Sequence, residues 1–125
     1  MAEASKDADR ARMREELGFQ RWEAIGHFTT DGDYYGFNRG DYRAAIAEYE
    51  KAWQVLFTPW QRRTGGVDLL LGIADFALRS ENAELAKETL DLLAPRSSEV
   101  GSAELEAALV KLARLAVPHD EQSPE

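Results

Sequence analysis

His27 and Asp31 come closest in this chain to a catalytic pair by residue type and spacing. Apolar residues around them recur at helical spacing, so both side chains are expected on one face of a helix. There the carboxylate could orient the imidazole as a general base. The spacing of the other residues specifies neither a nucleophile nor a second acid, and a lone helical histidine is typical of a groove or packing position. The prediction is therefore that the protein is not an enzyme.

A second candidate for chemistry is the stretch Asp31-x-Asp33-x-Tyr35-Gly36, which matches three positions of the calcium-binding loop of helix–loop–helix proteins. Its twelfth position, which should supply a bidentate glutamate, is Tyr42. The chain also has no cysteine, which excludes disulfides, thiolate zinc sites and cysteine nucleophiles. We therefore predict no metal site and no cofactor.

The net charge of the chain limits the kinds of partner that are expected. The 23 acidic residues against 15 basic residues give a formal net charge of −8, which opposes nucleic-acid binding. An acidic surface attracts basic partners, although acidity also simply keeps small proteins soluble. No apolar run approaches the ~20 residues of a membrane span. The polar first residues lack the apolar region of a signal peptide, which favours a cytoplasmic location.

Helical periodicity dominates the chain, and no credible strand is present, so the sequence predicts an all-α domain of about five helices. The predicted helices cover about residues 6–29, 41–56, 67–79, 83–94 and 102–116. Asp41 and Ser102 are expected to cap the N-termini of two of them. Pro95 is expected to end the fourth, with a polar loop over 96–101. By domain, we expect a flexible or frayed extension over 1–12, a helical domain over 13–117 and a disordered tail over 118–125.

Two pairs of predicted helices repeat one spacing of apolar and small residues. The first pair reads Trp22-x-x-Ile25-Gly26 and then Gly40-Asp41-Tyr42-x-x-Ala45-x-x-x-Tyr49-x-x-Ala52. The second reads Leu70-x-x-Ile73-Ala74-x-x-Ala77 and then Ala83-x-x-Ala86-x-x-x-Leu90-x-x-Leu93. This pattern resembles the tetratricopeptide repeat (TPR) family of helix hairpins, with a degenerate second repeat. The resemblance implies two antiparallel hairpins, small residues at close helix contacts, and a C-terminal capping helix or a homodimer to cover the ends.

The register of the first repeat predicts an insertion. When the repeat pattern is counted from Trp22, the turn between the two helices of the hairpin is expected near Asp33. The pattern of the second helix, however, begins at Gly40. The stretch between them is thus expected to be an inserted loop of about eight residues. Its candidate partner-binding residues are Asp33, Tyr34, Tyr35 and Phe37, because exposed aromatic side chains dominate many interfaces. The alternative is that this loop folds back and covers the end of the repeat.

The resemblance also implies a concave groove lined by the first helix of each pair. Its expected residues are Glu23, His27, Asp31, Asp68, Gly72, Asp75 and Arg79. Four of these interrupt the otherwise apolar helix over 67–79 along one line, which was recognised from polarity alone. An acidic groove favours a basic or amide-rich peptide. The alternative is a solvated face on which Asp75 pairs with Arg79.

A secondary candidate patch consists of Trp60, Arg62 and Arg63, since Trp and Arg are frequent at interface hot spots. The alternative is an ordinary connection with Trp60 packed inward. Taken together, the sequence predicts a non-catalytic protein–protein interaction module whose partner is another protein or peptide of basic character. A bacterial immunity or antitoxin protein that neutralises a cognate effector is one alternative, and a homo-oligomeric assembly factor is another.

Overall fold

The computed structural model describes residues 2–117, and these form helices and no strand, so the predicted all-α class is confirmed. The predicted tail over 118–125 lies outside the described residues. The helices are α1 (Ala2–Asp33), α2 (Tyr42–Val55), α3 (Pro59–Gln61), α4 (Val67–Ser80), α5 (Ala83–Val100) and α6 (Ala103–Ala116). Two π-helical turns join them, η1 (Tyr34–Asn38) and η2 (Arg62–Gly66).

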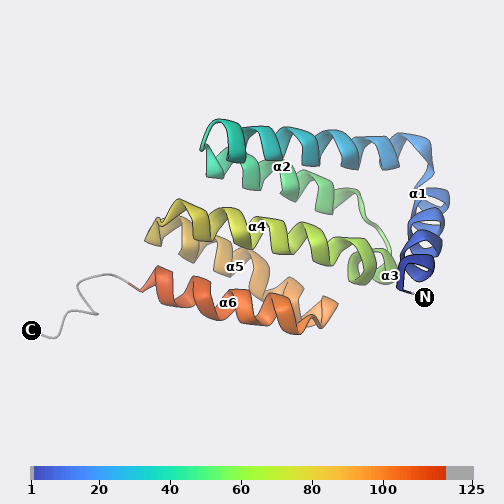
Figure 1. The fold of residues 1–125 in the computed structure, drawn as a ribbon. Coiled ribbons are helices and arrows are strands. Elements are labelled where there is room, and N and C mark those ends of the chain that lie inside the picture. Colours follow the sequence, from blue (N-terminus) through green and yellow to red (C-terminus); the bar gives the residue numbers. More distant parts are fainter. Residues whose placement is uncertain (1, 118–125) are drawn as a thin grey trace, which may run out of the picture.

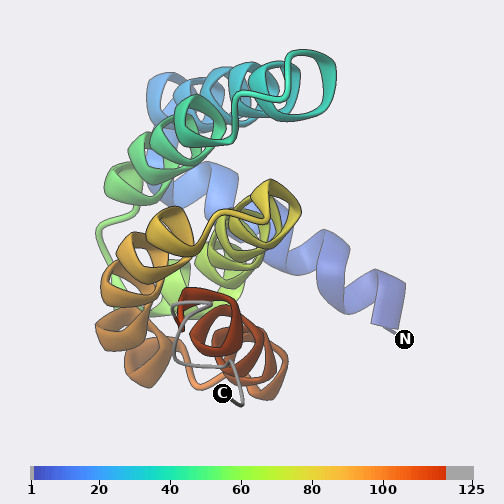
Figure 2. The ribbon, with the colours of Figure 1, turned by 90° about the vertical axis from the view of Figure 1, so that its left-hand side faces the viewer.

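The longer helices stack side by side, with the second part of α1 beside α2, then α4 and α5, and then α6 (Figure 1). Seen end-on, α2 and α5 lie on one side of the stack, with α4 and α6 beside them (Figure 2). Ion pairs join Arg43 to Glu88 and Glu50 to Arg96, at sequence separations of 45 and 46. Because this separation is nearly constant, α2 and α5 run parallel, as the second helices of consecutive hairpins do.

Four of the described helices begin at side-chain caps, and the shortest, α3, begins at Thr58, whose hydroxyl accepts from the Gln61 amide. The carboxylate of Asp41 accepts a hydrogen bond from the Ala44 amide (3.1 Å), and the Ser102 hydroxyl accepts one from the Leu105 amide (3.1 Å). Both starts were predicted. Asn82 caps α5 in the same way. Each cap satisfies a backbone N–H that the helix itself leaves without a partner, which stabilises the helix by about 1 kcal/mol.

One aromatic ring ties three helices together. Tyr49 of α2 lies between Gly32 of α1 and Gly72 of α4, where an added Cβ on either glycine would come closer than 3.0 Å to the ring. Glycine is therefore needed at both positions. The Tyr49 hydroxyl donates to Asp33 at 2.5 Å. Burial and then this hydrogen bond raise the pKa of Tyr49 well above its ordinary value.

The same glycine–aromatic contact recurs at Gly36 on Phe76 and at Gly66 on Trp53. The expected close contact at Gly26 is wrong, since nothing lies within 4 Å of a Cβ built there. The second half packs instead through fully buried aliphatic residues: Ala77, Ala86, Leu93, Leu105 and Leu112.

The predicted end of α5 is also wrong. Pro95 lies inside α5, and the expected polar loop over 96–101 is helical as far as Val100. Arg96 pairs with Glu50, and Ser97 and Val100 are buried, so tertiary contacts offset the loss of one helical hydrogen bond at the proline. Gly101, with φ 63°, ends the helix in the left-handed conformation.

The predicted inserted loop is not a loop. Helix α1 continues to Asp33, and η1 follows directly, with Gly36 buried against Phe76. A π-helical turn accommodates an extra residue within a helix, which the count from Trp22 does not foresee. The two glycines Gly65 and Gly66 likewise do not interrupt helical structure, because η2 leads directly into α4.

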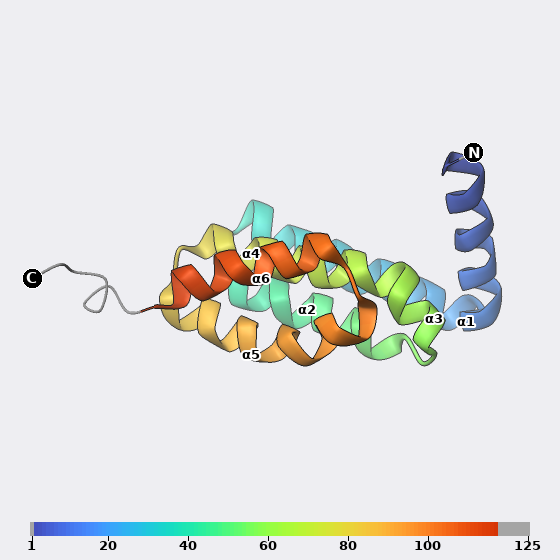
Figure 3. The ribbon, with the colours of Figure 1, turned by 90° about the horizontal axis from the view of Figure 1, so that it is seen from below.

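Helix α1 turns sharply at Gly18, the one residue in it with non-helical dihedral angles (φ 82°, ψ 165°). This conformation is accessible essentially to glycine alone. The expected continuous helix over 6–29 is therefore wrong at this position, and the expected extension over 1–12 is helical from Ala2. We call residues 2–17 the N-terminal arm. It crosses the end of the stack near α3 and projects on the side away from α5 (Figure 3).

Candidate functional site

The N-terminal arm is held on the body of the protein by a small set of contacts. Met13 and Leu17 are buried, and the methyl group of Met13 lies against Gly65. The Arg12 guanidinium stacks over the Trp60 ring, 3.8 Å from its centre. Burial of two apolar side chains contributes about 3–6 kcal/mol before the entropy of ordering is counted. The arm is thus positioned by its second half, next to Gly18.

A polar contact completes this junction. Glu16 accepts a hydrogen bond from Gln61 at 3.1 Å, and the fully buried Gln61 also accepts from the Phe57 amide at 2.8 Å. Hydrogen bonds from Arg12 and Gln61 to Glu16 hold the pKa of that carboxyl group below its ordinary value. Gln61 therefore links the arm to the connection between α2 and α4.

Two cavities meet at Trp22, which is half-buried, just beyond the bend at Gly18. The first, which we call the elbow cavity, has a volume of about 710 Å³. It is lined by Lys6, Asp9, Arg10, Met13, Trp22, Arg63, Thr64, Gly65 and Asp68. The second, the outer cavity, measures about 490 Å³. It is lined by Arg14, Phe19, Trp22, Glu23, Gly26, His27 and Thr30.

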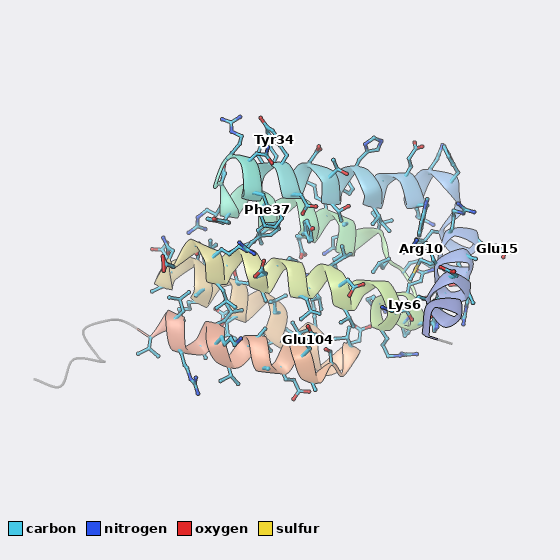
Figure 4. The ribbon with its side chains drawn as sticks, viewed as in Figure 1. Lys6, Arg10, Glu15, Tyr34, Phe37 and Glu104 are labelled. Carbon is cyan, nitrogen blue, oxygen red and sulfur yellow. The ribbon has the colours of Figure 1, made fainter. Side chains whose placement is uncertain are left out.

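Charged side chains reach the elbow cavity from both of its walls. Lys6 and Arg10 project from the arm toward the stack, whereas Glu15 points away from it (Figure 4). Arg63 and Asp68 come from η2 and α4. Among residues 6–117, no ion pair involves Lys6, Asp9, Arg10, Arg63 or Asp68.

The predicted groove residues do not gather in one place. Glu23 and His27 line the outer cavity, and Asp68 lines the elbow cavity. The hydrogen bond and charge of Glu48 raise the pKa of Lys51 on α2, against a lowering by burial. Asp31 adds a smaller rise, so it lies on the side of α1 near α2. His27 and Asp31 form no hydrogen bond within the described part of the chain.

The other predicted groove residues of α4 already have contacts within the protein. Gly72 packs against Tyr49 and is not a groove wall. Asp75 pairs with Arg79 at 2.7 Å, which is the alternative that the spacing of these residues leaves open. The Arg79 guanidinium lies 5.2 Å from the centre of the Phe37 ring. Asp68, Asp75 and Arg79 all remain exposed on α4, so the acidic groove stays a prediction.

The predicted loop residues form what we call the tip, residues 33–37, at the far end of α1 from the arm. Asp33 accepts the Tyr49 hydrogen bond, and Tyr35 is half-buried. Tyr34 and Phe37 are 50% and 57% exposed, and the Phe37 ring contacts that of Phe76, with 5.2 Å between centres (Figure 4). The tip is thus largely packing, with two partly exposed rings.

The secondary patch is divided. Trp60 is half-buried beneath Arg12, and Arg62 pairs with Glu99 of α5 at 2.5 Å. Arg63 lines the elbow cavity. No cluster of three or more histidine, aspartate or glutamate side chains in a metal-binding arrangement occurs among the described residues. No described helix combines the length and apolar character of a membrane span.

Sequence reasoning missed the basic residues of the arm, because residues 1–12 offer almost nothing apolar to bury. A signal was nevertheless present. Met13 and Leu17 stand one helical turn apart, and Lys6 and Arg10 continue that spacing toward the N-terminus. Two apolar residues one helical turn apart, the second directly before Gly18, indicate a short helix that packs separately.

No protein-family model, curated protein or solved structure matches this chain.

Proposed function

We propose that the protein is a non-catalytic protein–protein interaction module, and that it binds a segment of a partner protein at the surface around Trp22. The observation that carries this proposal is the pair of cavities that meet at this tryptophan. Their volumes lie within the range of about 300–1,000 Å³ typical of ligand sites. Half-buried Trp22 and Phe19, which is 73% exposed, are side chains of the kind that anchor interfaces.

The helix arrangement supports an interaction role of the TPR type. Gly32 meets the Ala45 backbone across the first hairpin, and Ala74 and Ala86 are buried in the second. Small residues at these positions let helices approach closely, as the resemblance to TPR hairpins implies. Such stacks offer extended surface and few converging reactive groups, which favours binding over catalysis.

Affinity capture from the source cell with four proteins, the wild type and three variants, tests the proposal. We expect wild type to retain a partner that Trp22→Ala and Phe19→Ala lose, since both substitutions remove apolar contact area at the cavities. Tyr34→Ala is the matched control, because Tyr34 is an aromatic residue, 50% exposed, at the far end of α1 from the arm. Circular dichroism checks that each variant is folded. A partner retained equally by all four proteins would contradict a site at Trp22.

Homo-oligomeric assembly is a second candidate function. It is favoured by Val110 and Val117, which are 51% and 39% exposed on and just after α6, the last helix of the stack. Self-association there would cover an open end of the stack. Light scattering over a hundredfold range of concentration tests this, and a constant monomer mass would refute it.

A further inference from the structure

Two sets of charged side chains differ in whether they are paired within the protein. Between the helices of the body, basic residues are paired: Arg43 with Glu88, Arg62 with Glu99 and Arg96 with Glu50. In the elbow cavity, Lys6, Arg10 and Arg63 face a common space together with Asp9 and Asp68, and none forms an ion pair with a described residue. The cavity therefore carries an excess of positive charge in a protein of net charge −8.

The geometry of the arm directs these charges inward. Lys6 and Arg10 stand one turn apart, and Met13 continues the same face into the buried contact with Gly65. Because Met13 fixes the rotation of the arm, the two basic side chains project toward the stack (Figure 4). Arg63 lines the same cavity from η2, and Trp22 supplies an apolar wall. A ligand that bridges the arm and the body would meet basic groups from both.

We propose that the elbow cavity binds an acidic segment of a partner protein. Carboxylates lie between Lys6 and Arg10 on one wall and Arg63 on the other, and an apolar side chain of the segment packs on Trp22. Guanidinium groups bind carboxylates through paired hydrogen bonds, and a partly enclosed site is screened less than an open surface. Asp9 and Asp68 leave room for one hydroxyl, amide or basic group within the segment. This inference rests on the proposed function and names the chemistry of its partner.

Two fluorescein-labelled peptides of twelve residues test the charge of the segment. One contains Glu and Asp around a single Trp and Leu, and the other has Lys in place of each acidic residue. Fluorescence anisotropy with the full chain should show the acidic peptide binding at least ~10-fold more tightly, with affinity falling as salt rises from ~50 to ~200 mM. Equal or tighter binding of the basic peptide would overturn the proposal.

Charge-reversal variants locate the site. Lys6→Glu/Arg10→Glu should weaken binding of the acidic peptide by at least ~10-fold, since two attractive contacts become repulsive. Lys87→Glu/Lys111→Glu changes the net charge equally, on exposed positions of α5 and α6, and should change affinity by less than ~2-fold. Equal losses in the two variants would reduce the effect to net charge and refute the site.

The two proposals fail in different ways. If capture of a cellular partner depends on Trp22 but not on Lys6 and Arg10, the interaction surface stands and the acidic segment is wrong. If capture depends on none of these residues, the proposed site itself is wrong. Circular dichroism of each variant excludes unfolding as the cause, and neither Lys6 nor Arg10 has an ion pair within the described chain to lose.

Discussion

The two ends of α1 present similar residue types and use them differently. At the tip, Asp33 accepts a hydrogen bond from Tyr49, and the Phe37 ring packs on Phe76. On α4 next to the tip, Asp75 and Arg79 pair with each other. At the elbow, charged side chains from the arm and the body face a cavity without pairing. The comparison teaches that an aromatic and acidic composition does not distinguish a site from a packing contact. What distinguishes them is whether the polar groups already have partners in the fold.

The largest expected effect concerns the aromatic cluster near the tip. Phe76 is 2% exposed and its ring contacts those of Phe37, Tyr42 and Tyr49. We expect Phe76→Ala to lower the free energy of unfolding by about 3–5 kcal/mol, because it leaves a large cavity. At the elbow, Phe19→Ala should change it by no more than about 0.5 kcal/mol. Urea denaturation followed by circular dichroism measures both, and a similar cost for both would remove the distinction.

The same substitution, glycine to alanine, at two positions gives a sharper comparison. In Gly72→Ala the new methyl group meets the Tyr49 ring, which cannot move aside because Gly32 lies on its other face. We expect a loss of about 1–3 kcal/mol from overpacking. Gly26→Ala, at the outer cavity, meets nothing within 4 Å and should stabilise the helix by about 0.5–1 kcal/mol. Effects of the same sign in thermal or urea unfolding would contradict the packing described for Tyr49.

The hydrogen bond from Tyr49 to Asp33 predicts a dependence on pH. Tyr49→Phe should cost about 1–2 kcal/mol, since Asp33 loses a donor in a half-buried position. The pKa of Tyr49 is raised above its ordinary value of 10.0, mainly by burial. The folded state therefore binds the Tyr49 proton more tightly than the unfolded state does. The contribution of this group to the free energy of unfolding is fully present below pH 10 and is lost as the pH rises above it. In Tyr49→Phe the decline attributable to this group should disappear from unfolding curves measured between pH 8 and pH 11.

The smallest effects concern single basic residues. Arg79→Gln removes an exposed ion pair with Asp75 and should cost at most about 1 kcal/mol. Arg63→Gln has no ion pair with a described residue to remove and should change the free energy of unfolding by less than about 0.5 kcal/mol. Binding of the acidic peptide should respond in the opposite order, with Arg63→Gln weakening it and Arg79→Gln leaving it unchanged. Anisotropy titrations of both variants check this reversal.

Local signals in the sequence predict much of the fold. The caps at Asp41 and Ser102 and the apolar faces of α2 and α6 follow from side-chain chemistry within one or two turns. The same local signals predict neither the end of α5 nor the bend of α1. Pro95 is tolerated because Arg96 and later residues find partners on other helices, and a glycine inside a helical pattern does not reveal which dihedral angles it adopts.

The site was harder to predict than the fold for a related reason. Glu23, His27 and Asp68 do line cavities, but the pairing of Asp75 with Arg79 and the contact of Gly72 with Tyr49 depend on side-chain packing that spacing alone leaves open. The basic residues of the arm reach the cavity only because the chain turns sharply at Gly18. A single backbone conformation thus decides which charges meet.

The ring of Tyr49, wedged between Gly32 and Gly72, has a mechanical consequence. It contacts three helices at once, so we expect α1 beyond its bend, α2 and α4 to move as one block. Trp22 and Asp68 lie on two of these helices, so we expect the distance between them to stay constant. The arm joins this block through the backbone of Gly18 and a handful of side chains. In a hydrogen-exchange experiment we therefore expect the amides of the arm to exchange independently of those of the block. The elbow cavity then has one rigid wall, formed by the block, and one mobile wall, formed by the arm.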